Sequence, residues 1–392
     1  MEFTPLTSDF TGFALDLSAA EQASLAEIRA FMEERVRPVI DDHWHRDAFP
    51  TDLIPGIAAL GVVGPGWPET ARFENSAVYR GWIALEMSRV DASVSTFVGV
   101  QNGLVAGSIG VAGSPAQRQE WLPRLADCSV VGAFGLTEPL SGSDAAQGLR
   151  TTARRDGDDW ILDGAKRWIG NATHADIVIV WAKDAASGQV LGFIVPTTAP
   201  GFTATKIERK ISLRMVQNAD IVLEGVRVPE AMRLQGASSF RDTARILRLT
   251  RAEVAWSAVG VMMGAFEAAV RYTTERVQFG KPIAGHQLVQ DLLAKSLGHI
   301  TASIALCVQV SRMLDEGRQE DAHSALAKAY VTSRMREVVG WCREVCGGNG
   351  IVTDYDVARF FADAEALYTY EGTAQMNALI VGRAISGLSA FA

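Results

Sequence analysis

The sequence predicts a multidomain α+β protein in which a β domain separates two helical parts. Apolar residues recur at helical intervals before about residue 130 and again after about residue 240. Between these stretches lie short β-branched runs, separated by turns that contain Gly, Pro and Asn. We therefore expect an N-terminal helical domain over residues 1–130, an antiparallel β-barrel or β-sandwich over 131–238, and a C-terminal four-helix bundle over 239–392.

The N-terminal part opens with a helix signal. Ser18 and Glu21 have the spacing of a capping box, in which two side chains satisfy the free N–H groups of a helix start. Pro38 predicts the end of this helix, because an interior proline removes a backbone hydrogen bond. Apolar side chains recur at helical spacing before it, at Leu25, Ile28, Met32 and Val36. Further helical stretches are expected over residues 52–62, 78–92 and 100–128.

Turn dipeptides mark the middle part. Asp156-Gly157 and Asp163-Gly164 are typical of tight hairpin turns, and the apolar residues 160–162 lie between them. Three further β-branched runs predict strands, over residues 177–181, 190–195 and 221–228.

Long helices are expected after residue 241. The segment 254–270 is apolar nearly all round and predicts a buried helix, and the polar Glu316-Gly317 pair predicts a short turn between antiparallel neighbours. One amphipathic helix is indicated by a single apolar stripe, at Val289, Leu293, Leu297, Ile300, Ile304 and Val308.

Composition argues against several kinds of protein. The chain has 37 Lys and Arg residues against 45 Asp and Glu residues, a formal charge of -8, so a nucleic-acid partner is not expected. The four cysteines lack the spacing of a structural zinc site, so no metal is expected. No stretch approaches the roughly 20 uninterrupted apolar residues of a membrane span. The first ten residues lack a signal-peptide pattern, and we therefore expect no membrane insertion and a cytoplasmic location.

Two motifs in the β part combine small, hydroxyl and aromatic residues. Residues 135–144, Gly-Leu-Thr-Glu-Pro-Leu-Ser-Gly-Ser-Asp, have the composition of a surface turn. The same residues would also let backbone N–H groups and hydroxyls approach a flat polar ligand. Residues 166–171, Lys-Arg-Trp-Ile-Gly-Asn, contain a tryptophan that either packs at a strand end or stacks on a cofactor ring.

The C-terminal part contains three further motifs. Residues 276–282, Arg-Val-Gln-Phe-Gly-Lys-Pro, have the cation, glycine and proline of a helix end. Residues 347–350, Gly-Gly-Asn-Gly, either break a helix or touch a pyrophosphate. In Tyr-Glu-Gly-Thr, residues 370–373, Glu371 is either a helix-dipole partner or a partly desolvated general base, because desolvation raises a carboxyl pKa.

The order of these five motifs resembles that of the acyl-CoA dehydrogenase family across essentially all 392 residues. The likeness is greatest to the branch with glutaryl-CoA dehydrogenase and plant short-chain acyl-CoA oxidases. It implies that the cofactor is FAD, that Glu371 is the catalytic base, and that a homotetramer shares its sites between subunits. The residues implied at FAD are Phe134, Leu136, Thr137, Gly142, Ser143, Trp168, Ile169, Gly170, Arg276, Gln287, Gly347, Gly348, Thr373 and Gln375. Those implied at the acyl-CoA substrate are Ser95, Gly99, Ser143, Arg251 and Gly372.

In some related enzymes the base lies instead on the helix that begins near residue 250. The matching position here is Thr250, which cannot serve as the base. Glu253 lies two residues beyond Arg251, and we expect it on another face of the helix. Glu371 is therefore the best candidate.

The resemblance implies that Glu371 removes the α proton while FAD accepts the β hydrogen as hydride, which yields a trans-2-enoyl-CoA. Glutaryl-CoA dehydrogenases hold the distal carboxylate with an Arg, and a Ser four residues later, on the helix after an Arg-Val-Asp motif. After Arg89-Val90-Asp91 this chain has Ser95 and Gly99 at those positions. A short, uncharged acyl chain is expected, and a glutaryl-CoA dehydrogenase-like enzyme is the alternative.

Gly170 bears on the electron acceptor. Dehydrogenases of the family usually carry Thr at this position, whereas the oxidases resemble this chain in carrying Gly. An electron-transfer flavoprotein is the expected acceptor, and an oxidase that reduces O2 to H2O2 is the alternative.

Overall fold

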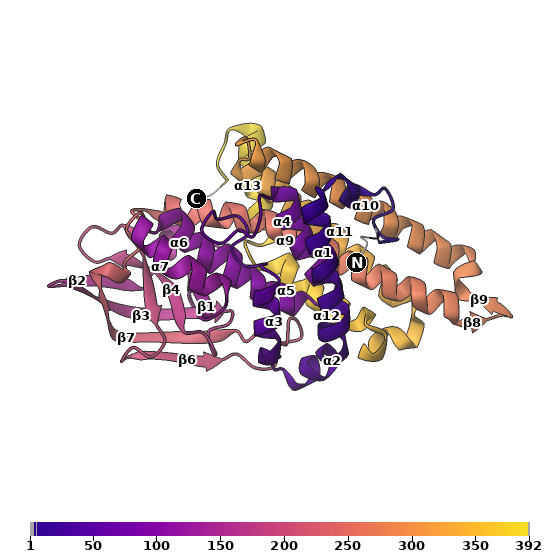
Figure 1. The fold of residues 1–392 in the computed structure, drawn as a ribbon, viewed down its shortest axis with the longest axis horizontal. Coiled ribbons are helices and arrows are strands. Elements are labelled where there is room, and N and C mark those ends of the chain that lie inside the picture. Colours follow the sequence, from indigo (N-terminus) through magenta and orange to yellow (C-terminus); the bar gives the residue numbers. More distant parts are fainter. Residues whose placement is uncertain (1–3, 5, 391–392) are drawn as a thin grey trace.

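The structure is a computed structural model that describes residue 4 and residues 6–390. Its order of helices, strands and helices confirms the predicted fold class (Figure 1). Part of the N-terminal stretch used for the signal-peptide expectation, residues 1–3 and residue 5, lies outside the described residues.

The N-terminal part consists of short helices around an apolar core. The capping box of Ser18 and Glu21 is present as predicted. The helix does not end at Pro38, however, because a π-helical turn, η2 (Met32–Val36), leads directly into α2, and Pro38 lies in the first turn of α2, where no N–H donor is needed. The α-helices of this part are α1 (Ala19–Phe31), α2 (Arg37–Arg46), α3 (Ile54–Ala59), α4 (Ala77–Val90), α5 (Ala92–Gly99), α6 (Gly107–Ala112) and α7 (Pro115–Ala126), with the π-helical η4 (Val100–Ala106) between α5 and α6.

The middle part forms one seven-stranded sheet of order β1-β4-β2-β3-β7-β6, with β5 beside β4. Most neighbouring strands are antiparallel, but β4 pairs in parallel with β1 and β2, so the sheet is mixed rather than wholly antiparallel. A four-residue helix, α8 (Ala145–Gly148), precedes β2. The strands are β1 (Gly132–Gly135), β2 (Thr152–Asp156), β3 (Asp159–Ile169), β4 (Ile177–Asp184), β5 (Val190–Pro196), β6 (Phe202–Lys206) and β7 (Ala219–Pro229).

The two Asp-Gly pairs differ in their conformation. Asp156-Gly157 lies at the predicted hairpin between β2 and β3. The second predicted turn was wrong, because Gly164 lies inside β3, where the register with β7 shifts. Gly164 has φ 152°, and a Cβ there would lie 2.5 Å from Thr151 Oγ1. Glycine thus permits a β-bulge at this point, and the strand continues through it.

The C-terminal part contains the long helices that the sequence predicts, with Gly317 in a left-handed turn between α10 and α11. The Gly347–Ile351 segment forms a 3-10 turn that ends α11, as its helix-breaking composition indicated. A short β8–β9 hairpin (Val277–Gln278 and Lys281–Pro282) lies at the end of the molecule remote from the sheet (Figure 1). The helices are α9 (Phe240–Glu275), α10 (Gln287–Asp315), α11 (Asp321–Val345), α12 (Val357–Thr369) and α13 (Ala374–Ser386).

Three helical stretches are, by length and composition, long and apolar enough to cross a membrane, contrary to the sequence expectation: Ala92–Ala112, Phe240–Glu275 and Gln287–Asp315. Their apolar windows are 67%, 83% and 39% buried inside the protein, respectively. Packing in the core therefore accounts for most of the apolar surface of the first two. The third, α10, leaves much of its apolar window uncovered by this chain.

Candidate functional site

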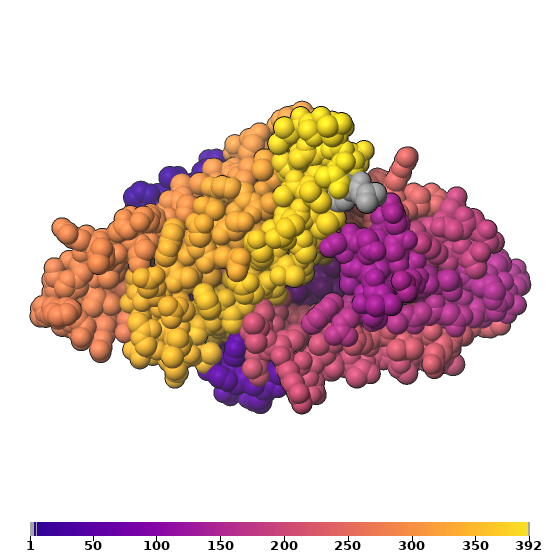
Figure 2. Space-filling view, turned by 180° about the vertical axis from the view of Figure 1, so that it is seen from behind, coloured from indigo at the N-terminus to yellow at the C-terminus, as the bar shows by residue number. Residues whose placement is uncertain are grey.

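A cavity of about 1220 Å³ lies where the β sheet meets the helices on either side of it in sequence. Figure 2 shows the surface hollowed between the yellow C-terminal segment and the neighbouring magenta and pink segments. Its walls come from α5 and η4, from β1 and the loop after it, from the end of β3, from α9, and from the turn between α12 and α13. Segments from all three predicted domains therefore build it.

Most of the predicted site residues line this cavity: Ser95, Gly99, Phe134, Leu136, Thr137, Gly142, Ser143, Trp168, Ile169, Gly170, Arg251, Glu371, Gly372 and Thr373. The others lie outside its lining and are exposed on this chain: Arg276, Gln287, Gly347, Gly348 and Gln375. Two of these, Arg276 and Gln287, flank the remote β8–β9 hairpin. A role for them at FAD requires a second subunit and stays a prediction.

A buried ion pair joins the two motifs of the β domain. Lys166 Nζ lies 2.9 Å from Glu138 Oε1 and donates to the carbonyls of Leu136 and Trp181 at 3.2 and 2.7 Å. Glu138 also accepts a hydrogen bond from the N–H of Thr151 at 2.9 Å. Removing either charge would leave the other buried and unpaired, so the pair holds the loop after β1 against the sheet.

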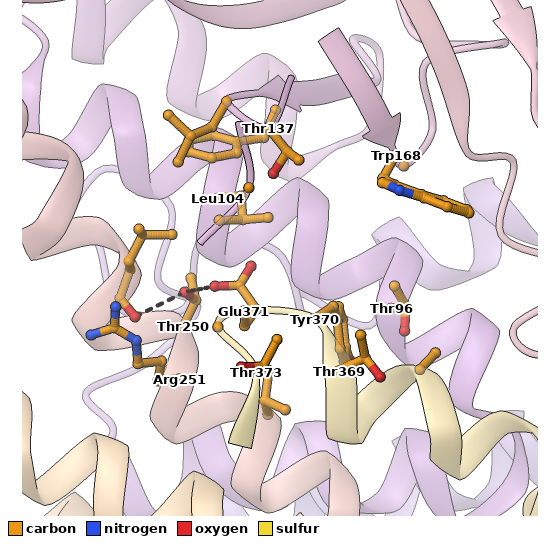
Figure 3. A pocket seen from close by; sticks show the side chains of 18 of the residues that line it. Thr96, Leu104, Thr137, Trp168, Thr250, Arg251, Thr369, Tyr370, Glu371 and Thr373 are labelled. Atoms are coloured by element: carbon orange, nitrogen blue, oxygen red, sulfur yellow. Dashed lines mark hydrogen bonds between the residues drawn. The ribbon is translucent and has the colours of Figure 1, made fainter. Parts of the chain in front are cut away.

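The end of β3 presents a flat, open surface to the cavity. Trp168 has φ 65°, its side chain is 51% exposed, and Figure 3 shows it projecting from the strand end. Among the described residues other than its sequence neighbours, Val100 Cγ2 would lie nearest to a Cβ on Gly170, at 3.4 Å, and none would lie within 4 Å of a Cβ on Gly142. With the hydroxyl of Thr137 nearby in the lining, this surface fits a flat heteroaromatic ring.

Glu371 lies in the cavity, on the tight turn between α12 and α13 (Figure 3). Its backbone has φ 54°, and that of Gly372 has φ 83°. Thr250 Oγ1 donates a hydrogen bond to Glu371 Oε2 at 2.8 Å. Burial raises the pKa of the Glu371 carboxyl, while the Thr250 hydrogen bond and the cations of Arg251 and Lys328 act in the opposite direction. The net increase in pKa suits a general base.

Lys328 holds this turn from α11, a contact that the sequence reasoning missed. Its buried Nζ donates to the backbone carbonyls of Tyr370 and Gly372, on either side of Glu371. Burial lowers the pKa of Lys328 to about 7, against the opposing effect of Glu371. Thr373 caps α13, since its side chain accepts a hydrogen bond from the N–H of Met376 at 3.2 Å. The position of the carboxyl group is thus fixed by backbone contacts on both sides.

A second carboxyl group, that of Glu253, also reaches the cavity. Its Oε1 lies 3.4 Å from where a Cβ of Gly99 would be, and its Oε2 lies 2.9 Å from that of Gly103. Burial and the charge of Glu371 raise the pKa of Glu253 to about 8. The expectation, which compared Glu253 with Arg251, did not anticipate that Glu253 reaches the cavity. Glu253 is three residues from Thr250, and such residues are neighbours on a helix.

The described residues contain no group of three or more His, Cys, Asp and Glu side chains arranged to hold a metal ion. The cysteines at 128, 307, 342 and 346 are free thiols.

Comparison with known proteins identifies the family of this chain. The acyl-CoA dehydrogenase N-terminal, middle and C-terminal domain models match residues 18–129, 133–226 and 239–386. The chain is 30% identical over 373 residues to the short-chain specific acyl-CoA dehydrogenase of mouse mitochondria, covering 94% of this chain and 90% of the relative. It is also 30% identical over 381 residues to the glutaryl-CoA dehydrogenase of Desulfococcus multivorans, covering 93% and 96%.

A solved structure extends the likeness to the whole fold. The crystal structure of a glutaryl-CoA dehydrogenase from Mycobacterium smegmatis in complex with FADH2 has a TM-score of 0.94 and 34% identity, and 98% of each chain is covered. The open surface around Trp168 and Gly170 fits the flavin ring of such a cofactor. This chain therefore belongs to the acyl-CoA dehydrogenase family and is an oxidoreductase whose cofactor is FAD.

Proposed function

We propose that this enzyme oxidises a short-chain, uncharged acyl-CoA to the trans-2-enoyl-CoA, with Glu371 as the base. The observation that carries this proposal is the position of the Glu371 carboxyl, which has a raised pKa and lies in the same cavity as the surface that fits a flavin. When bound there, FAD accepts the hydride from the β carbon of the substrate.

Glu371 would take the α proton of the thioester. Its backbone N–H makes no hydrogen bond with any other described group and is therefore available to the thioester oxygen, on which negative charge develops. A donor at that oxygen stabilises the charge that builds up as the proton leaves. Thr250 keeps the carboxylate oriented through its 2.8 Å hydrogen bond.

The same cavity would hold the cofactor. The hydroxyls of Thr137 and Ser143 and the ring of Trp168 line it on the side of the sheet. In a homotetramer the remaining predicted residues would contact FAD of a neighbouring subunit. The exposure of Phe279 and Leu288, at 94% and 82%, and the uncovered apolar window of α10 support such an assembly.

Two features of the cavity favour an uncharged acyl chain. Ser95 and Gly99 both line the cavity. They stand at the positions where glutaryl-CoA dehydrogenases carry the Arg and Ser that hold the distal carboxylate, and neither supplies a cation. The carboxyl group of Glu253 lies opposite Gly99. A distal carboxylate would lose hydration there without gaining a guanidinium partner, which costs several kcal/mol.

We propose an electron-transfer flavoprotein as the electron acceptor and the cytoplasm as the location. The oxidase alternative depends on Gly170, which leaves room beside the flavin surface for O2. Both electron acceptors are compatible with the same proton and hydride transfers.

The test is anaerobic mixing of the purified holoenzyme with butyryl-CoA, octanoyl-CoA or glutaryl-CoA, followed by admission of air. We expect butyryl-CoA to bleach the flavin fastest and air to reoxidise it slowly. Equal or faster bleaching by glutaryl-CoA would contradict the proposed substrate class. Reoxidation by air at the rate of turnover would establish the oxidase instead.

A further inference from the structure

Polar side chains gather where α5 and α9 cross at one end of the cavity. Ser95 Oγ on α5 lies 3.4 Å from Ser257 Oγ on α9. One turn along both helices, Gly99 faces the Glu253 carboxyl. Residues four apart share a helix face, so these two contacts lie side by side. Two hydroxyls and one carboxyl therefore form a polar group on the wall of the cavity, which we call the α5–α9 cluster.

Within the part of the chain that the structure describes, the Glu253 carboxyl of this cluster has no partner. Among the described residues no side chain or N–H donates a hydrogen bond to it, and no cation forms an ion pair with it. Glu253 is half-buried and lines the cavity. An unpaired carboxyl that is covered by an apolar ligand costs free energy, so a ligand that pairs with it gains a corresponding advantage.

Glycines on the facing helical segment, Gly99 and Gly103, leave space for this carboxyl. A Cβ at Gly103 would lie 2.9 Å from Glu253 Oε2, closer than side chains pack in practice, and one at Gly99 would lie 3.4 Å from Oε1. Because both positions are glycine, no side chain displaces the Glu253 carboxyl from its position beside the cavity. The Glu253 carboxyl therefore lies in the wall of the cavity that would hold the acyl chain.

We propose that the α5–α9 cluster of Ser95, Glu253 and Ser257 is a hydrogen-bonding subsite that selects an acyl chain with a terminal hydroxyl over a plain chain of the same length. The proposal rests on the acyl-CoA dehydrogenation proposed above and names the substrate class. A hydroxyl both donates and accepts hydrogen bonds, so it matches a protonated carboxyl and serine hydroxyls at once. The raised pKa of Glu253, about 8, keeps its proton in place at neutral pH.

The reaction itself is unchanged by the hydroxyl. With 4-hydroxybutyryl-CoA, Glu371 takes one α proton and FAD one β hydride, and the products are 4-hydroxycrotonyl-CoA and reduced FAD. The hydroxyl carbon is neither oxidised nor reduced. Its role is to position the chain and to satisfy the carboxyl that a hydrocarbon would leave unpaired.

The experiment compares kcat/KM of the holoenzyme for 4-hydroxybutyryl-CoA, butyryl-CoA and 4-aminobutyryl-CoA. Wild type should prefer the hydroxylated chain, and Glu253→Leu should lower the ratio of hydroxylated to plain substrate by about tenfold or more. Ser257→Ala should lower the ratio in the same direction, which provides a second test if Glu253→Leu fails to retain FAD. Glu275→Leu, at the exposed end of the same helix, is the matched control and should keep the wild-type ratio.

The contrary outcomes separate this inference from the proposed function. If butyryl-CoA bleaches the flavin but the ratio is the same in wild type, Glu253→Leu and Ser257→Ala, the subsite does not exist. If wild type prefers 4-aminobutyryl-CoA and Glu253→Leu removes that preference, the subsite selects an ammonium group. That result would overturn the proposed selection of a hydroxyl. If none of the acyl-CoAs bleaches the flavin of wild type, the proposed function itself fails, and the inference with it.

Discussion

At the residue scale, the carboxyl groups of Glu371 and Glu253 line the same cavity but have different surroundings. Glu371 has the hydrogen bond of Thr250 and the nearby cations of Arg251 and Lys328, all of which stabilise its carboxylate. Glu253 has no such support, and the charge of Glu371 raises its pKa further. When two carboxyls interact, the better stabilised one ionises first. This difference supports the proposed role of Glu371 as the base and of Glu253 as a carboxyl that holds its proton at neutral pH.

The pKa of Glu253 predicts a pH dependence of substrate binding. A plain acyl chain covers this carboxyl, and covering the ionised form costs more than covering the neutral form. The groups that face it are Glu371 and Tyr370, neither of which supplies a positive charge. Butyryl-CoA affinity should therefore be full below about pH 8 and fall as the pH rises through that value.

The measurement is a titration of the flavin absorbance with a nonreactive butyryl-CoA analogue between about pH 6 and about pH 9.5. Glu253→Gln, which cannot ionise, should show no such loss of affinity above about pH 8. A loss of the same size in both proteins would show that another group is responsible.

The sequence reached Glu371 because its motif contains aromatic neighbours and a helix start that can be read locally. Glu253 was missed because its spacing of two residues from Arg251 points to another helix face, whereas its spacing of three residues from Thr250 makes these two neighbours. Lys328 was missed because the contacts of that side chain span 42 and 44 residues. No local spacing encodes a partner at such a distance.

At the scale of elements, the turn between α12 and α13 positions Glu371, the proposed base. Lys328 reaches it from α11, and Asn377 donates to the carbonyl of Gly372 at 2.9 Å from α13. Glu371 and Gly372 both have positive φ in this turn. Left-handed backbone at a non-glycine residue costs free energy and persists where surrounding contacts fix it. These contacts are what hold the carboxyl group in the cavity.

Lys328→Met should remove both carbonyl contacts and, at pH values near and below the Lys328 pKa of about 7, a cation near Glu371. Without that cation the pKa of Glu371 rises further, so flavin reduction at neutral pH should slow by about tenfold for each unit of the increase and recover toward higher pH. The assay is the pH profile of anaerobic reduction by butyryl-CoA. Lys295→Met, an exposed lysine on α10 paired with Asp291, is the control. A pH profile equal to that of wild type would rule out this positioning role.

Element boundaries show why local signals mislead. Pro38 and Asp163-Gly164 both carry breaker residues, yet the chain continues as helix and as strand through these positions. A π-helical turn before Pro38 and a β-bulge at Gly164 absorb the irregularity. The sequence identifies an irregularity at each point, whereas packing against neighbouring elements decides whether the chain turns.

The whole molecule brings three sequence regions to one cavity, and the order of those regions was predictable from periodicity alone. Within one chain, five of the predicted site residues do not line the cavity: Arg276, Gln287, Gly347, Gly348 and Gln375. These residues are exposed, two of them beside the exposed Phe279 and Leu288. A subunit interface at this end would account for both observations.

Arg276→Ala should weaken FAD retention and oligomer stability together, because a cofactor that binds only the assembled state stabilises that state. The measurements are FAD content after gel filtration and the melting temperature at several protein concentrations. Arg227→Ala, on the exposed face of β7, is the matched control. Full FAD content with an unchanged melting temperature would contradict a role for Arg276 across subunits.

The proposed role of Glu371 is tested most directly by anaerobic flavin reduction by butyryl-CoA in the Glu371→Gln holoenzyme. The amide keeps the shape of the side chain but cannot accept the α proton, so we expect FAD to remain bound and the reduction rate to fall about a hundredfold or more. The control is Glu365→Gln, which changes another carboxyl of the lining, one that pairs with Arg336. Its flavin should be reduced at close to the wild-type rate. A Glu371→Gln enzyme with full FAD and more than about a tenth of the wild-type rate would contradict the assignment of the base.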